Sequence, residues 1–118
     1  MKDLLEMSER EYFAQFAKRV GMFVGRTSFR AATDFMMGYD QAARRYGEPG
    51  LTGWREWLMA NYEVGANLVW AGQVMQIAKP GWQGEQDFTY EEEERLLKVL
   101  FELLDEFLAE RERLAAQP

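Results

Sequence analysis

Apolar residues recur along the chain at spacings of three and four, the period that places them on one face of an α-helix. This pattern predicts an all-α protein, a single compact domain of about five helices without a confident strand. The expected helices cover residues 9–20, a segment from Thr27 or Ser28 to Tyr46, a short segment after Thr52, residues 67–78 and a long segment after Thr89.

Residues at the ends of these segments support the assignment. Ser8 with Glu11 and Thr89 with Glu92 have the spacing of a capping box, in which side chains at the first turn accept from free backbone N–H groups. Gly47 suits the position just after a helix, because glycine adopts a left-handed conformation without a steric penalty. The ends of three helices are therefore predicted from local spacing alone.

Interior glycines and one apolar segment indicate how the helices pack. Gly21 and Gly25 are expected to interrupt the chain after the first helix. Gly38 lies inside a helical pattern, where it costs roughly 1 kcal/mol relative to alanine, so close packing of another helix is expected there. The segment 67–78, which Asn67 can cap, is apolar on nearly every side and is therefore expected to be the central helix.

Composition fits one domain with a real core. The chain has 118 residues, of which 47% are hydrophobic, so we expect a single helical domain over residues 1–118 with frayed ends at 1–7 and 115–118. The net charge of −6 is uneven: residues 1–47 hold 8 basic and 6 acidic residues, whereas residues 48–118 hold 6 basic and 14 acidic ones. Glu93, in the acidic start of the last helix, is expected to contribute little to stability.

The charge distribution limits the classes of partner that the chain is expected to bind. An acidic half argues against nucleic-acid binding, which needs cations to neutralise phosphates, and favours a partner with a basic surface. No apolar run approaches the roughly 20 residues that cross a bilayer, so no membrane partner is expected. The N-terminal residues do not resemble a signal peptide, because acidic residues interrupt them, and a cytoplasmic location is the expectation.

The residue types exclude several chemistries. The chain has no histidine and no cysteine, so a thiolate nucleophile, a serine–histidine pair and a di-metal site built on Glu-x-x-His are all excluded. Its two serines, Ser8 and Ser28, stand at helix starts and are interpreted as caps. We therefore expect no catalytic residue, no metal site, no cofactor and no enzymatic activity.

Two groups of residues are candidates for binding a protein partner. Trp82 lies in a Gly/Gln-rich loop with Glu85 and Asp87, where an exposed tryptophan would suit an interaction hot spot. Spacings of three and four also place several carboxylates on part of the surface of the last helix. These carboxylates are Glu102, Asp105, Glu106 and Glu110. The alternative interpretation is core packing for the tryptophan and a solvated acidic face for the carboxylates.

A third candidate is an anion site at the start of the second helix. Backbone N–H groups at a helix start attract anions, and Arg19, Arg26 and Arg30 flank this one. Ordinary turn geometry explains the same residues.

Most of the chain resembles a largely uncharacterised family of small bacterial proteins, whose pattern is roughly Arg-Pro-x-Met-Tyr-x-Gly-x-x-Ser followed by Phe-x-x-Gly-Tyr. The corresponding residues are Arg19, Gly21, Met22, Phe23, Gly25 and Ser28, then Phe35, Gly38 and Tyr39. Further similar stretches are Trp54-x-x-Trp57-Leu58, Asn67–Trp70 and Leu100–Leu108. The chain departs from the pattern at Val20 and Phe23, where the family has Pro and Tyr.

Members of this family resemble immunity proteins that are encoded beside bacterial toxins. The resemblance implies a non-enzymatic binding protein that neutralises a cognate toxin. Because the acidic residues gather in the second part of the chain, we expect the acidic surface of the last helix and the 81–87 loop to be the docking face that blocks the active site of the toxin. Two alternatives stay open. One is a structural or regulatory homo-oligomer, such as a homodimer, whose self-interface is the apolar stripe of the last helix or exposed aromatic residues. The other is a small-anion-binding protein or enzyme that uses Arg19, Arg26 and Arg30.

Overall fold

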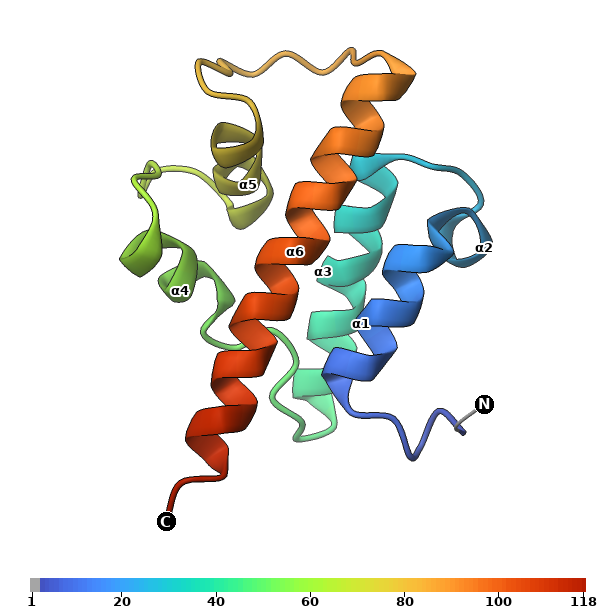
Figure 1. Cartoon of the computed structure of the whole chain (residues 1–118), viewed down its shortest axis with the longest axis vertical. Helices are drawn as coiled ribbons and strands as arrows, with labels where there is room; N and C mark the ends of the chain where they lie inside the picture. Colours follow the sequence, from blue (N-terminus) through green and yellow to red (C-terminus); the bar gives the residue numbers. More distant parts are fainter. Residues whose placement is uncertain (1–2) are drawn as a thin grey trace.

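Helices make up the regular structure of the computed structural model, which describes residues 3–118 (Figure 1). Within these residues the helices are α1 (Glu9–Lys18), α2 (Val20–Val24), α3 (Phe29–Arg45), α4 (Trp54–Asn61), α5 (Trp70–Ala78) and α6 (Tyr90–Ala115). The described residues contain no strand, so the all-α prediction is confirmed. The short α2 is the one helix that the sequence pattern did not predict.

The long helix α6 occupies the middle of the fold. It packs against α1, α3, α4 and α5, and Figure 1 shows α1, α2 and α3 on one side of it and α4 and α5 on the other. Its 26 residues span about 39 Å at 1.5 Å per residue, close to the longest extent of the molecule, 41 Å. The central position expected for residues 67–78 thus belongs to α6, because the nine-residue α5 is too short to reach every other helix.

The core combines two aromatic clusters along α6. Phe16 is fully buried and stacks on Phe23 with ring centroids 4.7 Å apart, while Phe101 of α6 lies 5.2 Å away. On the other side of α6, Trp54 packs against Phe107 at 5.5 Å. The leucines of α6 that face inward, Leu96, Leu100 and Leu104, have no exposed surface. Burial of both faces of α6 therefore joins the two halves of the fold.

The chain turns between α1 and α3 through α2 instead of through a plain loop. Val20 is buried, and Phe23 and Val24 pack against the core, so the spacing of three and four residues gives this short helix an apolar face. Gly21 lies inside α2, and only Gly25, with a φ of 83°, ends it. The predicted break at Gly25 is confirmed, whereas the break at Gly21 is wrong.

The predicted capping boxes are confirmed at Ser8 of α1 and Thr89 of α6. Ser28 caps α3 through its side chain, which accepts from the N–H of Ala31 at 3.1 Å. The expected caps at Thr52 and Asn67 are wrong, because α4 and α5 begin after Gly53 and Val69, neither of which forms a side-chain cap. Burial of apolar side chains, not capping, sets the starts of these two helices.

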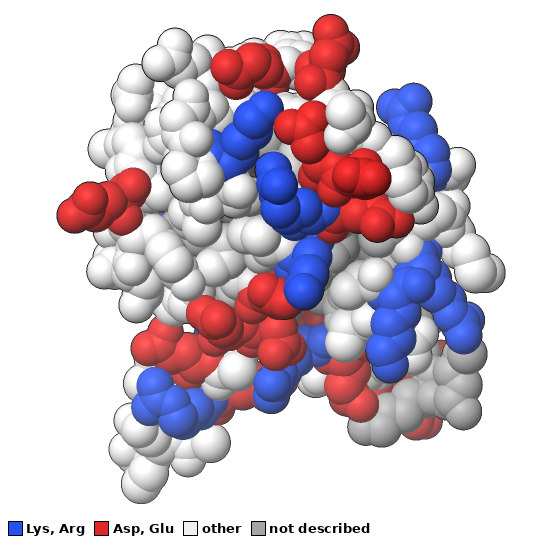
Figure 2. Space-filling model, turned by 45° about the horizontal axis from the view of Figure 1, so that its top comes forward, with Lys and Arg blue, Asp and Glu red and all other residues white. Residues whose placement is uncertain are grey.

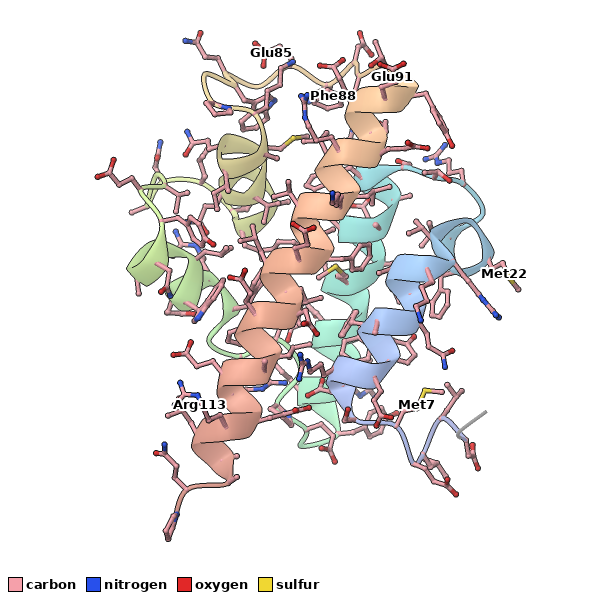
Figure 3. The ribbon with its side chains drawn as sticks, in the orientation of Figure 1. Met7, Met22, Glu85, Phe88, Glu91 and Arg113 are labelled. Carbon is pink, nitrogen blue, oxygen red and sulfur yellow. The ribbon has the colours of Figure 1, made fainter. Side chains whose placement is uncertain are left out.

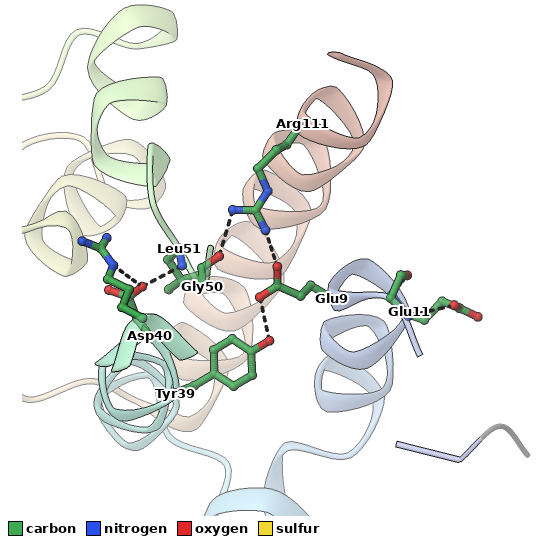
Figure 4. A network of polar contacts seen from close by, with 9 residues as sticks. Glu9, Glu11, Tyr39, Asp40, Gly50, Leu51 and Arg111 are labelled. Atoms are coloured by element: carbon green, nitrogen blue, oxygen red, sulfur yellow. Dashed lines mark hydrogen bonds and ion pairs between the residues drawn. The ribbon is translucent and has the colours of Figure 1, made fainter. Parts of the chain in front are cut away.

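A polar network joins three helices and the turn before α4 (Figure 4). The Arg111 guanidinium donates to the backbone oxygen of Gly50 at 2.8 Å and forms an ion pair with Glu9. The Tyr39 hydroxyl donates to the other oxygen of Glu9 at 2.7 Å. Partial burial of Tyr39, aided by the Glu9 carboxylate, raises the pKa of its hydroxyl, which therefore stays protonated as a donor. The network fixes α1, α3, α6 and the turn before α4 relative to one another.

Gly38 has an environment different from the expected one. A Cβ built on this residue would meet no atom within 4 Å, so no helix packs closely there. Gly38 lies in the interior of α3 and has a negative φ. Nothing in the structure therefore requires glycine at this position.

The Gly38→Ala variant is expected to be more stable than the wild type by about 0.5–1 kcal/mol, the difference between alanine and glycine inside a helix. Urea unfolding followed by circular dichroism measures it. Gly25→Ala is the matched control, since a Cβ there also meets no atom within 4 Å but the φ of 83° is left-handed, and this variant should lose about 1–2 kcal/mol. Equal effects of the two substitutions would contradict the assigned backbone conformations.

Candidate functional site

A groove of about 780 Å³ runs between α1 and α6, and we call it the α1–α6 groove. Its floor is apolar and includes the buried rings of Phe13 and Phe101 and the side chains of Val20, Leu97 and Leu108. Charged residues of both signs form its rim, namely Arg10, Lys18, Glu94, Lys98, Glu102, Asp105 and Glu106. An apolar floor inside a polar rim is the anatomy of a protein interface.

Three of the four carboxylates predicted on α6 line this groove: Glu102, Asp105 and Glu106. The fourth, Glu110, faces α4 instead. Its carboxylate accepts from the indole N–H of Trp57 and also forms an ion pair with Arg113 at 3.5 Å. The structure thus gathers Glu102, Asp105 and Glu106 at one site and assigns Glu110 to a contact between α4 and α6.

Asp105 is joined to α1 across the groove. The Arg10 guanidinium donates to both oxygens of the Asp105 carboxylate, at 2.7 and 3.1 Å, a bidentate geometry. The hydrogen bond and the positive charge of Arg10 lower the pKa of Asp105 below its ordinary value. Asp105 is therefore an ionised partner of α1, and less of its charge is available to another molecule than the sequence alone predicted.

This pair makes part of the stability depend on pH. Because the pKa of Asp105 is lower in the folded state than in the unfolded chain, the pair stabilises the fold above the ordinary aspartate value of about 3.9. That contribution is lost as the pH falls through the lowered value. We expect Arg10→Gln to be less stable than the wild type at pH 7 and equally stable once Asp105 is protonated, as urea unfolding across this range would show. Arg19→Gln serves as the control, and an unchanged pH profile for Arg10→Gln would contradict the pairing.

Glu102 and Glu106 keep their charges toward solvent. They lie four residues apart on α6 and both are exposed, a like-charge arrangement that destabilises a helix by about 0.2–0.5 kcal/mol. Glu106 has one long contact, the Tyr62 hydroxyl at 3.5 Å. Figure 2 shows acidic side chains gathered in two regions of this face with Lys and Arg between them, while the surface on the α4–α5 side is largely uncharged.

A second cavity, of about 320 Å³, lies between α3, α5 and the segment 79–89, and we call it the α3–α5 cavity. Its apolar walls include Phe29, Met37, Met75, Trp82 and Phe88. Its polar lining consists of Arg30, Thr33, Asp34, Glu85, Gln86 and Glu93. The side-chain view in Figure 3 places Phe88 between α5 and the start of α6, with Glu85 on the outer side of the same segment. The cavity thus brings together Trp82, Glu85 and Arg30, which the sequence assigned to two separate sites.

Trp82 is half-buried and fixed in orientation. Its indole N–H donates to the backbone oxygen of Glu85 at 2.8 Å, and its ring packs over Gly72, where a Cβ would lie 3.6 Å from the ring. The Glu85 carboxylate accepts from the backbone N–H of Gln83 at 3.0 Å, which lowers its pKa. Asp87, the third residue predicted in this loop, is exposed and does not line the cavity.

The start of α3, predicted to receive an anion, is already occupied by one from the chain itself. The Glu93 carboxylate of α6 accepts from the backbone N–H of Phe29 at 2.7 Å. A carboxylate at a helix N-terminus is favoured by the helix dipole, so Glu93 stabilises α3 and replaces the external anion. This contact also gives Glu93 a structural role that its place in an acidic run did not indicate.

The three arginines of that predicted site do not converge. Arg19 lies between α1 and α2, Arg26 follows α2, and both are exposed. Arg30 turns toward the α3–α5 cavity and donates to the Gln86 side chain at 3.1 Å. Of the three arginines predicted to hold the anion, one therefore lies at a cavity and two lie on the open surface.

Across residues 3–118, no group of acidic residues is arranged to hold a metal ion. Both cavities instead combine an apolar surface with charged groups at the edge, which suits binding by shape and charge. Arg10, Asp34 and Gly72 could not be predicted as parts of these sites, because each contributes through contacts between separate elements that helical spacing does not show.

No protein-family model, no curated protein and no solved structure matches the chain. None of the helices in the described part of the chain has the length and apolar character needed to cross a bilayer.

Proposed function

We propose that this chain is a non-enzymatic binding protein that neutralises a cognate bacterial toxin. In this proposal the α1–α6 groove docks on a basic surface around the active site of the toxin and excludes its substrate. The observation that carries the proposal is the apolar groove of about 780 Å³ with the exposed pair Glu102 and Glu106 on its rim. The resemblance to immunity proteins, which rests on the motif from Arg19 to Tyr39, supplies the kind of partner.

The groove supports docking of a protein more than capture of a small molecule. Its floor of aromatic and aliphatic side chains is open along α1 and α6, and a partner that covers it would remove apolar surface from water. The rim then sets orientation, because Glu102 and Glu106 attract basic side chains while Lys18 and Lys98 repel them. Such a mixed rim favours one register of a basic partner over others.

Two carboxylates that form no ion pair with another described residue, Glu102 and Glu106, distinguish this rim from an ordinary solvated surface. Asp105 is paired with Arg10 and Glu110 with Arg113, so both are used within the chain. Glu102 and Glu106 instead stand one turn apart with like charge, an arrangement that folding does not favour. A basic partner would relieve this repulsion on binding, which is the reason to place the docking contact there.

Co-expression with the product of the neighbouring gene tests the proposal. The wild-type chain is expected to protect cells from that product, and the double variant Glu102→Lys/Glu106→Lys to lose protection, with an affinity lower by at least about tenfold. Glu48→Lys/Glu63→Lys is the matched control, since it changes the net charge equally at exposed positions outside the groove. Equal protection by both double variants would exclude the groove as the docking face, and absence of protection by the wild type would overturn the proposed function.

The homo-oligomer alternative named two self-interfaces, the apolar stripe of α6 or exposed aromatic residues. Leu96, Leu100 and Leu104 of the stripe are fully buried in the core of the chain itself. A second copy therefore has no access to them in the folded protein.

A further inference from the structure

The α3–α5 cavity is separate from the α1–α6 groove and has its own chemistry. Its volume of about 320 Å³ lies at the small end of the range for ligand sites, about 300–1,000 Å³. It is bounded by α3, by α5 and by the segment 79–89 that leads from α5 into α6, so the chain encloses it on three sides. Enclosure on three sides favours a small molecule over a flat protein surface.

The apolar wall is formed by a ring held in place. The backbone oxygen of Glu85 accepts from the Trp82 indole N–H, and Gly72 lets the ring lie directly against α5. Met37 and Met75 complete the wall with flexible side chains that adapt to the shape of a ligand. Phe88 is already covered on one face by Lys79, whose Nζ lies 5.3 Å from the ring centre. The indole of Trp82, held by its hydrogen bond, is thus the fixed aromatic part of the cavity wall.

The charges at the cavity select a cation. Of the described residues that line it, Asp34, Glu85 and Glu93 are acidic and Arg30 is the only basic one. Glu93 accepts from the N–H of Phe29 and Glu85 from the N–H of Gln83, while the Arg30 guanidinium already donates to Gln86, so the lining keeps an excess of negative charge. An indole ring also attracts cations through its quadrupole.

The buried hydroxyl group of Thr33 in the cavity wall also favours a cationic ligand. Thr33 is almost fully buried, and its hydroxyl donates its one proton to the backbone oxygen of Arg30 at 3.0 Å. The Thr33 oxygen is left as an acceptor, so it would suit an N–H group of a ligand and not another acceptor. An anion would meet an acceptor in the wall and net negative charge at the edge.

We propose that the α3–α5 cavity binds a small organic cation, an amine with an aromatic or branched apolar body. The body lies against Trp82 and the two methionines, and the ammonium group faces Asp34 and Glu85. The site needs no toxin partner and goes beyond the proposed function. Its ligand class is a primary amine of about the size of phenethylamine.

Calorimetric titration of the full chain with phenethylamine tests the site, beside phenethyl alcohol and phenylacetate as neutral and anionic counterparts. We expect saturable one-to-one binding of the amine that weakens as salt rises, weaker binding of the alcohol and no binding of phenylacetate. Thermal stabilisation of the chain by the amine should follow from the same equilibrium. Equal binding of the three compounds, or no saturable binding of the amine, would overturn the proposal.

Three variants test whether phenethylamine binds in the α3–α5 cavity. Asp34→Asn/Glu85→Gln should weaken binding of phenethylamine by about tenfold, and Arg30→Gln should strengthen it about threefold, because it removes the only positive charge in the lining. Glu102→Gln, in the other groove, should leave binding unchanged. Circular dichroism confirms that each variant is folded. If Glu102→Gln weakened binding as much as the double variant, the ligand would not occupy this cavity.

Discussion

The Trp54→Ala variant is expected to lose about 3–5 kcal/mol of unfolding free energy, as deletions of buried tryptophans do. Trp54 is 1% exposed, and its ring packs against Trp57 at 5.9 Å, Trp70 at 6.0 Å and Phe107 at 5.5 Å. Its removal leaves a cavity among three other large rings, which cannot all move inward to fill it. A loss of this size is a large part of the stability of a typical small domain, about 5–15 kcal/mol.

Chemical unfolding monitored by far-UV circular dichroism measures this loss, with Trp70→Ala as the control. Trp70 belongs to the same cluster but is only half-buried, so its replacement removes less buried surface and should have a smaller effect. If Trp70→Ala were the more damaging variant, the centre of this half of the core would lie at α5 and not between α4 and α6.

The second large effect concerns the turn before α4. Gly50 has a φ of 53°, and a Cβ there would lie 2.6 Å from Oδ1 of Asp40 and 3.1 Å from its backbone oxygen. The Asp40 carboxylate cannot move away freely, because Oδ1 accepts from the N–H of Leu51 at 2.7 Å and from Arg44 at 2.9 Å. Gly50→Ala should therefore cost more than about 2 kcal/mol, from the left-handed backbone and the lost hydrogen bonds together.

The Gly47→Ala variant separates the penalty of the left-handed backbone from the loss of the Asp40 hydrogen bonds. Its φ of 81° is also left-handed, but a Cβ there meets no atom within 4 Å, so only the backbone penalty of about 1–2 kcal/mol applies. The double variant Asp40→Ala/Gly50→Ala should lose less than the sum of the two single variants, because the close contact is then absent. Additive losses in urea unfolding would show that the Asp40 side chain does not restrict Gly50.

The features predicted from sequence are those set by neighbours in the chain. The caps at Ser8 and Thr89 depend on residues three positions away, and the stripe of α6 repeats over many turns. The helix α2 has only five residues, too few for its period to stand out from the surrounding glycines. Local spacing therefore predicts long, capped helices well and short, uncapped ones poorly.

The sites depend on contacts that local spacing does not contain. Arg10 and Asp105 are 95 residues apart, and Phe29 and Glu93 are 64 residues apart, yet each pair is in direct hydrogen-bond contact. The acidic run at the start of α6 predicted a favourable helix dipole, but it did not distinguish Glu93, which reaches α3, from Glu91, which is exposed. Similarly, Trp82 was a candidate for an exposed interaction hot spot. In the structure its ring packs against Gly72 of α5, a contact that the spacing of residues in the loop does not indicate.

We propose that the chain acts by binding a different protein. Size-exclusion chromatography with light scattering, on the chain alone and mixed with the product of its neighbouring gene, measures this directly. We expect a species of 13.8 kDa for the chain alone and a one-to-one complex after mixing. A stable species of twice that mass alone, with no new complex after mixing, would contradict it.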